Sequence, residues 1–136
     1  MSTAVWMRDD LGPGHRITTD RFNRSLIAAY GAQDPVTSYN SPVGTLPVFL
    51  EPRFDGTVLN SLQRGRIRYV IMDRRLTTAL PLVGYYYEQG EPNTFAYQSP
   101  IDLAALEKFR SVRHVSLVYD SGDLQVYDVG ALTGAN

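Results

Sequence analysis

The stretch that decides the fold class is residues 65–91, GRIRYVIMDRRLTTALPLVGYYYEQGE. Its apolar run, 69–72, ends abruptly in three consecutive charges at 73–75. A short apolar run bounded in this way is typical of a buried strand, and α/β folds tend to place their sites where such strands end. A proline-broken segment then leads to three tyrosines at 85–87 and an acidic turn. The stretch predicts a central strand over 67–72 that delivers charge to one edge of a sheet.

The sequence before this stretch predicts helix, strand and helix in that order. A short helix over 4–11 follows Ser2 and Thr3, with Val5, Trp6 and Leu11 facing inward, and Gly12-Pro13-Gly14 ends it. The β-branched segment 15–20 reads as a strand. Asp20 stands at an N-cap position before a helix over 21–32. Apolar residues recur there at helical spacing, so we expect the buried stripe of this helix to be Phe22, Leu26, Ala29 and Tyr30.

Prolines exclude a long helix between 33 and 53, so short extended pieces are expected at 36–38 and 47–50. Asp55 caps a predicted helix over 56–64, and Gly65 fits the position just after its end. A further helix runs to Arg110, and its expected buried positions are Leu103, Leu106 and Phe109. Alternating residues at 115–119 and 124–129, joined by a turn at 120–123, predict a β-hairpin.

These elements predict one soluble α/β domain over 1–136, with 131–136 as a disordered tail. Its architecture is a sandwich with a mixed, partly parallel sheet flanked by helices and ending in an antiparallel hairpin. A chain of 136 residues fits a single core. No apolar run approaches the roughly 18 residues of a membrane span, and the N-terminal sequence is too short and too acidic for a signal peptide.

The composition excludes several classes of function. Net charge is −1 and the pI is near 6.1, so nucleic acid is not an expected partner. The chain has no cysteine, which removes disulfides and thiolate metal sites. His15 and His114 stand without acidic or histidine neighbours at ligand spacing, so no metal site is predicted. We expect no cofactor and no catalytic residue, because no nucleophile motif or facing pair of carboxylates is recognisable.

One group of charged residues is the best candidate for a ligand site. Asp20 and Asp73, with the residues that follow them, would lie side by side if the two strands they end are neighbours. We call this group the charged rim; it consists of Asp20, Arg21, Asn23, Arg24, Asp73, Arg74 and Arg75. One interpretation is a cross-strand network of Asp–Arg ion pairs that is purely structural. The other is an anion-binding site.

The three tyrosines beside the rim are a second candidate. If they alternate in a strand, Tyr86 faces one side and Tyr85 and Tyr87 face the other. One side would pack in the core. The other side could offer an aromatic platform to a sugar ring or to a partner.

Across nearly its whole length the chain resembles a known kind of domain. The motifs are W-x-R at 6–8, D-R-x-N at 20–23, A-x-Y-G at 28–31, R-Y-x-x-x-D-R-R-L at 68–76 and D-S-G-D-x-x-x-Y-D at 120–128. They are similar to those of a C-terminal domain in polytopic membrane proteins of GC-rich Gram-positive bacteria. These proteins are described as integral membrane proteins or as relatives of the glycosyltransferases that use polyprenyl-phosphate sugars.

The resemblance implies a location and a role. The location is the outer face of the cytoplasmic membrane. In such glycosyltransferases the catalytic carboxylate lies between membrane helices, so the resemblance implies a non-catalytic domain. Its expected partners are a saccharide or polypeptide acceptor and the membrane-embedded part of the same protein. The alternatives are a structural module that forms a homodimer through exposed tyrosines and, less favoured, a small hydrolase.

Overall fold

The computed structural model describes residues 2–37 and 44–135. The strands are β1 (Arg16–Thr18), β2 (Asp34–Pro35), β3 (Tyr69–Asp73), β4 (Ser116–Asp120) and β5 (Leu124–Asp128). The helices are α1 (Thr3–Trp6), α2 (Arg21–Gly31), α3 (Leu46–Leu50), α4 (Gly56–Gly65), α5 (Leu103–Glu107) and α6 (Gly130–Thr133). Three further turns are the π-helical η1 (Met7–Leu11) and the 3-10 helices η2 (Arg74–Thr77) and η3 (Lys108–Ser111).

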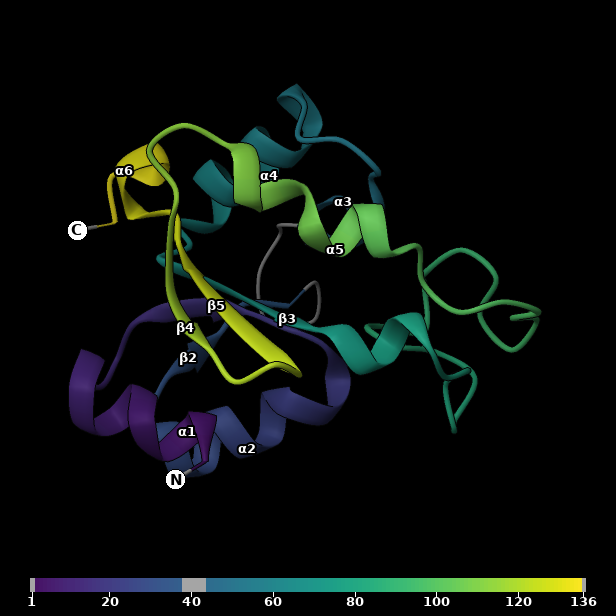
Figure 1. Cartoon of the computed structure of the whole chain (residues 1–136), viewed down its shortest axis with the longest axis horizontal. Coiled ribbons are helices and arrows are strands. Elements are labelled where there is room, and N and C mark those ends of the chain that lie inside the picture. Colours follow the sequence, from purple (N-terminus) through teal and green to yellow (C-terminus); the bar gives the residue numbers. More distant parts are fainter. Residues whose placement is uncertain (1, 38–43, 136) are drawn as a thin grey trace.

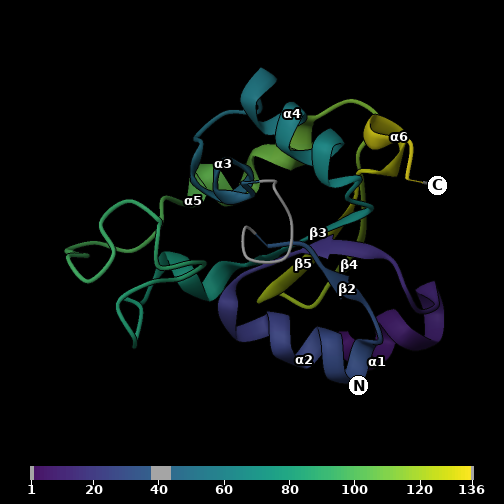
Figure 2. The same ribbon diagram turned by 180° about the vertical axis from the view of Figure 1, so that it is seen from behind.

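The five strands form one mixed sheet with the order β2-β1-β3-β5-β4. β1 runs parallel to β2 and to β3, whereas β5 runs antiparallel to both β3 and β4. Helices α1 and α2 lie on one side of the sheet, and α3, α4 and α5 lie on the other (Figures 1 and 2). The predicted fold class, including the closing hairpin, is confirmed.

The central strand β3 is buried along its whole length and separates two cores. Tyr69 and Ile71 belong to the smaller core under α1 and α2. Val70 and Met72 point the other way, into the larger core under α3, α4 and α5. A strand covered by helices on both faces needs apolar residues at every position. This is the reason why its sequence is a continuous apolar run rather than an alternating one.

Helix α2 differs from the sequence prediction in the face that it buries. Asp20 caps it as expected, accepting from the backbone N–H of Phe22 and of Asn23 at 3.0 and 3.2 Å. The buried residues, however, are Asn23, Ile27 and Gly31. Phe22, Leu26 and Tyr30, predicted to be buried, are 40%, 52% and 61% exposed, and Ala29 is exposed too. The helix therefore turns its larger apolar stripe outward.

Glycine explains why the weaker stripe of α2 is buried. The Cα of Gly31 lies so close to α1 that a Cβ there would stand 3.1 Å from the carbonyl oxygen of Ala4. A helix that approaches its neighbour this closely must present its smallest side chain at the contact. In α1 and η1 the buried residues are Thr3, Ala4 and Met7. The side chains of Val5, Trp6 and Leu11, predicted to face inward, are half-buried.

Four smaller predictions also need correction. Residues 47–50, expected to be extended, belong to α3, because Pro47 stands in the first turn, where a missing N–H costs nothing. The extended piece expected at 36–38 was placed too late in the chain, since the strand in this region, β2, ends at Pro35; Ser38 itself lies outside the described residues. Arg66, with φ of 50°, takes the left-handed position predicted for Gly65. Leu103 is exposed, whereas Leu106 and Phe109 are buried as expected.

The last residues of the chain are partly helical. Part of the predicted tail 131–136 lies in α6, and the Thr133 hydroxyl donates to the Ile67 carbonyl at 2.8 Å. Asn136 lies outside the described residues. In the described part of the chain, no helix combines the length and the apolar character that crossing a bilayer requires.

Candidate functional site

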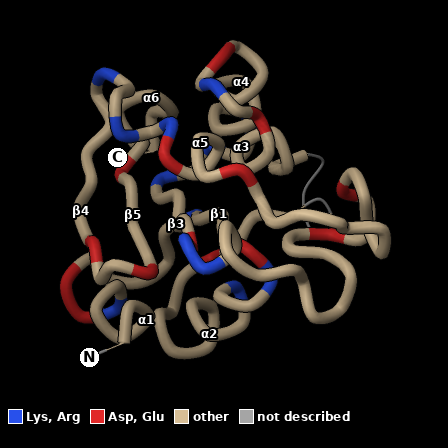
Figure 3. The backbone as a smooth tube through the Cα atoms, turned by 45° about the vertical axis from the view of Figure 1, so that its right-hand side comes forward, with Lys and Arg blue, Asp and Glu red and all other residues tan. Residues whose placement is uncertain are grey.

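The charged rim forms where two parallel strands end. The register pairs Ile17 with Tyr69 and Thr18 with Val70, so β1 and β3 finish at the same edge of the sheet. The predicted neighbourhood of the two strand ends is therefore confirmed. Figure 3 shows acidic and basic residues gathered at this edge.

The contact between the two strand ends runs through an amide rather than an arginine. The side-chain nitrogen of Asn23 donates to Asp20 at 2.7 Å and to Asp73 at 2.9 Å. Asp73 is ion-paired within its own segment, because Arg75 donates to its two oxygens at 2.9 and 2.6 Å. Asp–Arg ion pairs across the strands were one of the two sequence-based interpretations. Among the described residues, the side chain that bridges the two carboxylates is instead that of Asn23, which is 5% exposed.

The pKa values of the two carboxyls of the rim are shifted in opposite directions. Burial raises the pKa of the Asp20 carboxyl, and the nearby Asp73 carboxylate adds to the rise, while hydrogen bonds from Asn23 and Thr19 oppose it. Burial alone would also raise the pKa of Asp73, but hydrogen bonds from Arg75 and Asn23 outweigh it and hold that pKa below its usual value.

The four arginines of the rim point to different partners. Arg75 binds Asp73, and Arg74 lies 3.6 Å from the Glu107 carboxylate. Arg24 donates to the backbone carbonyl of Tyr87 at 2.6 Å. The guanidinium of Arg21 lies over the ring of Tyr85, 5.3 Å from its centre. The arginines thus do not converge on one empty position, and anion binding at the rim stays a prediction.

The tyrosines 85–87 lie in a loop, not in the strand that their alternation suggested. Tyr86 and Tyr87 are both buried, at 1% and 3% exposed, so the predicted two-faced arrangement is wrong. Tyr87 stacks on Phe49 with ring centres 4.3 Å apart, and burial raises the pKa of its hydroxyl well above the usual value. Only Tyr85 is partly exposed. Loop backbone can turn consecutive side chains to one side, which a pleated strand cannot do.

Glu91 holds this loop in place, and the sequence analysis missed it. Its carboxylate accepts hydrogen bonds from the backbone N–H of Tyr86 and of Tyr87 at 2.6 and 2.8 Å. The Tyr97 hydroxyl donates to the same carboxylate at 2.7 Å. Glu91 is 4% exposed, so these donors replace water around a buried charge. In the sequence, Glu91 is recognisable only as part of the acidic turn that follows the tyrosines.

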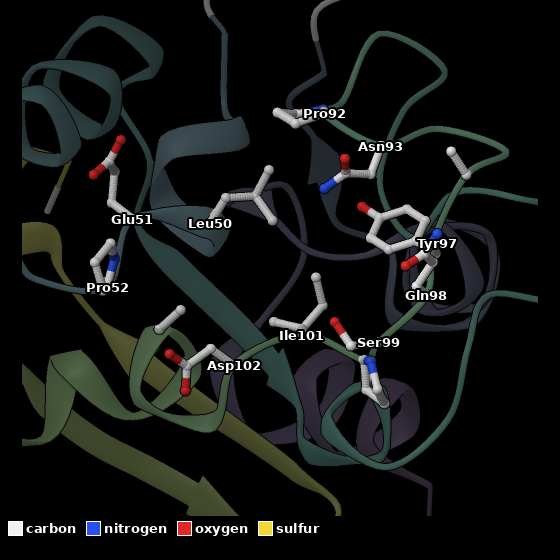
Figure 4. A pocket seen from close by; sticks show the side chains of 13 residues that line it. Leu50, Glu51, Pro52, Pro92, Asn93, Tyr97, Gln98, Ser99, Ile101 and Asp102 are labelled. Carbon is white, nitrogen blue, oxygen red and sulfur yellow. The ribbon is translucent and has the colours of Figure 1, made fainter.

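A polar hollow of about 840 Å³ opens beside this loop (Figure 4). Its wall comes from the residues after α3 on one side and from 92–105 on the other. Figure 4 shows Asn93, Gln98 and Ser99 around it, with Leu50 and Ile101 to their left. The side chains of Asn93, Gln98 and Ser99 make no hydrogen bond to any other residue in the described part of the chain. This hollow could not be predicted from the sequence, because the loops that form it have no periodic pattern of apolar residues.

The side chain of His15 is engaged within the protein. His15 donates from Nε2 to the Leu11 carbonyl at 2.9 Å and packs edge-on against Tyr69. Within residues 2–37 and 44–135, no group of three histidine, cysteine or acidic side chains is arranged to hold a metal ion.

Comparisons with known proteins place the fold. No protein-family model matches the chain, and no curated protein matches it in sequence. Among solved structures, the C-terminal globular domain of an oligosaccharyltransferase from Archaeoglobus fulgidus is similar, with a TM-score of 0.58. The match covers 94% of this chain and 97% of that one, at 13% sequence identity. The two share a fold over nearly their full lengths.

Proposed function

We propose that this chain is a non-catalytic domain of a glycosyltransferase-like integral membrane protein, of the class that uses polyprenyl-phosphate sugars. It would lie on the outer face of the cytoplasmic membrane. The observation that carries the proposal is the fold shared with the C-terminal globular domain of the Archaeoglobus fulgidus oligosaccharyltransferase over 94% and 97% of the two chains. Coverage of nearly the whole of both chains fits a domain that is used as one unit.

The proposed role is to bind or position a saccharide or a polypeptide acceptor, and the polar hollow supports it. Asn93, Gln98 and Ser99 offer amide and hydroxyl groups that are not engaged with other described residues. Such groups exchange hydrogen bonds equally well with sugar hydroxyls and with peptide backbone. Leu50 and Ile101 add apolar surface to the same hollow. A concave site with apolar walls and a few polar groups is the common form of a ligand site.

The hydrogen bonds that Asp20 and Asp73 accept in the rim agree with a non-catalytic role. Asp20 accepts from two backbone N–H groups, from Asn23 and from Thr19. Asp73 accepts from Asn23 and from the side chain and backbone of Arg75. A general base needs a lone pair directed at its substrate, and the oxygens of these two carboxylates are directed at the protein itself.

Binding is tested by NMR titration of the ¹⁵N-labelled chain with oligosaccharides and with short peptides. We expect shifts at the amides of Asn93, Gln98 and Ser99 at millimolar ligand. Gln98→Ala should weaken the response, whereas the matched control Gln89→Ala, an exposed glutamine outside the hollow, should leave it unchanged. If neither ligand class moves these amides, the binding role is wrong.

The cellular location is tested separately with an antibody raised against this domain. In fractionated cells the domain should be found with membranes. Protease added to intact protoplasts should remove it, because the outer face of the membrane is then exposed. Recovery of the domain in the soluble cytosol, protected from the protease, would contradict the proposal.

The alternative is a structural module that forms a homodimer through exposed tyrosines. Tyr30 is the observation in its favour, since it is 61% exposed on the outer face of α2. Sedimentation at increasing concentration distinguishes the two proposals. A monomer whose mass does not change with concentration would exclude the dimer.

A further inference from the structure

Most of the large apolar side chains that reach solvent gather on one surface. Among the described residues ten of them are exposed, and seven of these belong to α2 or to the loops between η2 and α5. We call these seven the apolar band; they are Phe22, Leu26, Tyr30, Leu80, Leu82, Val83 and Phe95. Single exposed apolar residues are normal, whereas a gathering of this kind marks an interaction surface.

Five residues of the band, from α2 and from the loop after η2, line two hollows that share Leu26. Phe22 and Leu26 line a groove of about 470 Å³ together with Leu80 and Leu82. Leu26 and Tyr30 line a neighbouring hollow of about 320 Å³. In Figures 1 and 2 the loop that follows η2 reaches down to the level of α2, so that loop and helix border the same side of the molecule.

The projecting end of the band is held rigidly. The backbone N–H of Phe95 donates to the Gly84 carbonyl at 2.7 Å, which joins the two loops. The Phe95 ring covers Gly84 so closely that a Cβ there would lie 2.2 Å from the ring. Phe95 has φ of 62°, a strained conformation for a bulky residue. The structure thus maintains backbone strain while holding an aromatic ring that is 72% exposed.

The shape of this end suits a fluid partner. Leu82 borders the groove but is 87% exposed, and Phe95, which does not line the groove, is 72% exposed, so both side chains stand out from the surface. A protein partner would need a matching pocket for each of them, with packing close to that of a protein interior. The boundary between headgroups and acyl chains takes up projecting apolar side chains without a preformed pocket.

The charges beside the band suit the same partner. Asp73 is the one acid that lines the groove or the neighbouring hollow, and it is 3% exposed and paired with Arg75. The Arg75 side chain is 57% exposed. Arg21 lies over the rings of Phe22 and Tyr85, at 5.6 and 5.3 Å from their centres. Arginines beside apolar and aromatic side chains can reach phosphate headgroups while their stems stay in apolar surroundings.

We propose that the apolar band is a contact surface for a lipid bilayer. Leu82 and Phe95 enter the interfacial region, and Arg21 and Arg75 meet the headgroups. This contact does not depend on the acceptor-binding role of the polar hollow, and it would orient the domain relative to the membrane surface.

The test is flotation of the purified chain with vesicles of phosphatidylcholine, with and without phosphatidylglycerol. We expect the chain to float with both and more strongly with the anionic lipid. Leu82→Asp should lower vesicle binding by about tenfold or more, since a carboxylate replaces an inserted apolar group. Leu117→Asp is the matched control, because Leu117 is an exposed leucine on β4 outside the band. It should bind vesicles like the unchanged chain.

A second readout follows the projecting end directly. Phe95→Trp adds an indole to a chain whose other tryptophan is Trp6, and its fluorescence should shift to the blue and be quenched by brominated acyl chains. Absence of flotation at every lipid concentration would overturn the proposal. So would an equal loss of binding in Leu82→Asp and Leu117→Asp. A dimer in solution that Leu82→Asp dissociates would show instead that the band meets a second copy of the chain.

Discussion

Asn23 and Asp73, fifty residues apart in the sequence, are joined by a hydrogen bond of 2.9 Å between the amide nitrogen and the carboxylate. The same amide donates to Asp20 at 2.7 Å. One buried side chain therefore ties the first turn of α2 to the end of β3 and supplies both carboxylates of the rim with a donor. A buried carboxylate without its donors is costly, so this link contributes to the stability of the whole sheet edge.

Replacing Asn23 with alanine should destabilise the fold markedly. Asn23→Ala leaves Asp20 and Asp73 each without one hydrogen-bond donor, and the expected loss in unfolding free energy is about 2–4 kcal/mol. Urea unfolding followed by circular dichroism measures it. Asn60→Ala is the control, since Asn60 is an exposed asparagine on α4, and its effect should stay within about 0.5 kcal/mol. Equal losses in the two variants would show that the bridge is not stabilising.

The main elements of the fold could be predicted from the sequence because local signals and packing agree. The run ending at Asp73, the cap at Asp20 and the hairpin turn each specify one conformation. The buried face of α2 could not be predicted, because apolar spacing favours Phe22 and Leu26 while the close approach to α1 selects Gly31. That contact joins distant segments, and helical periodicity carries no information about it.

The candidate site, like the fold, could be predicted only in part from the sequence. The meeting of Asp20 and Asp73 followed from parallel neighbouring strands, a rule that the sequence can use. The role of Glu91 and the polar hollow could not be derived, because both depend on how two irregular loops fold on each other. The tyrosines 85–87 were misplaced for the same reason, since the Glu91 carboxylate binds their backbone and fixes a loop where alternation favoured a strand.

Removing the charge of Glu91 should loosen the loops without unfolding the sheet. In Glu91→Gln one oxygen becomes an amino group that faces backbone N–H donors, so the bonds from Tyr86 and Tyr87 cannot all persist. Amide exchange at these two residues should speed up by roughly 30-fold or more, the equivalent of about 2 kcal/mol. Exchange in β3 and β5 should change little. Glu107→Gln, which removes a surface carboxylate, is the control; slowed or unchanged exchange at Tyr86 would contradict the prediction.

Lys108 should make stability rise with pH above neutrality. Burial lowers the pKa of this amine to about 8, although it donates to the carbonyls of Glu51 and Ala105. The unfolded chain then binds more protons than the folded one between pH 8 and the ordinary lysine pKa of about 10.4, so folding is favoured as pH increases through this window. The gain approaches about 3 kcal/mol at its upper limit.

The measurement is urea unfolding at pH 7, 8, 9 and 10 for the unchanged chain and for Lys108→Met. The difference between the two unfolding free energies should change steadily in favour of the unchanged chain as pH rises. Lys108→Met itself should lack this rise, since no other group described here has a pKa lowered into that range. A difference that stays constant from pH 7 to pH 10 would mean that Lys108 is charged and well solvated in the folded protein.

Gly84 and Phe95 should prove energetically coupled. Gly84→Ala adds a Cβ at φ of 88° and 2.2 Å from the Phe95 ring, so the ring must move away. The left-handed backbone alone costs about 1–2 kcal/mol, and displacement of the ring adds to this only while the ring is present. In the Phe95→Ala background the same substitution should therefore cost about 1 kcal/mol less. Gly90→Ala, in an exposed turn with open space around it, should be nearly neutral. Costs for Gly84→Ala that are equal in both backgrounds would show that the ring does not rest on Gly84 in solution, and that the projecting end of the band is not held by this contact.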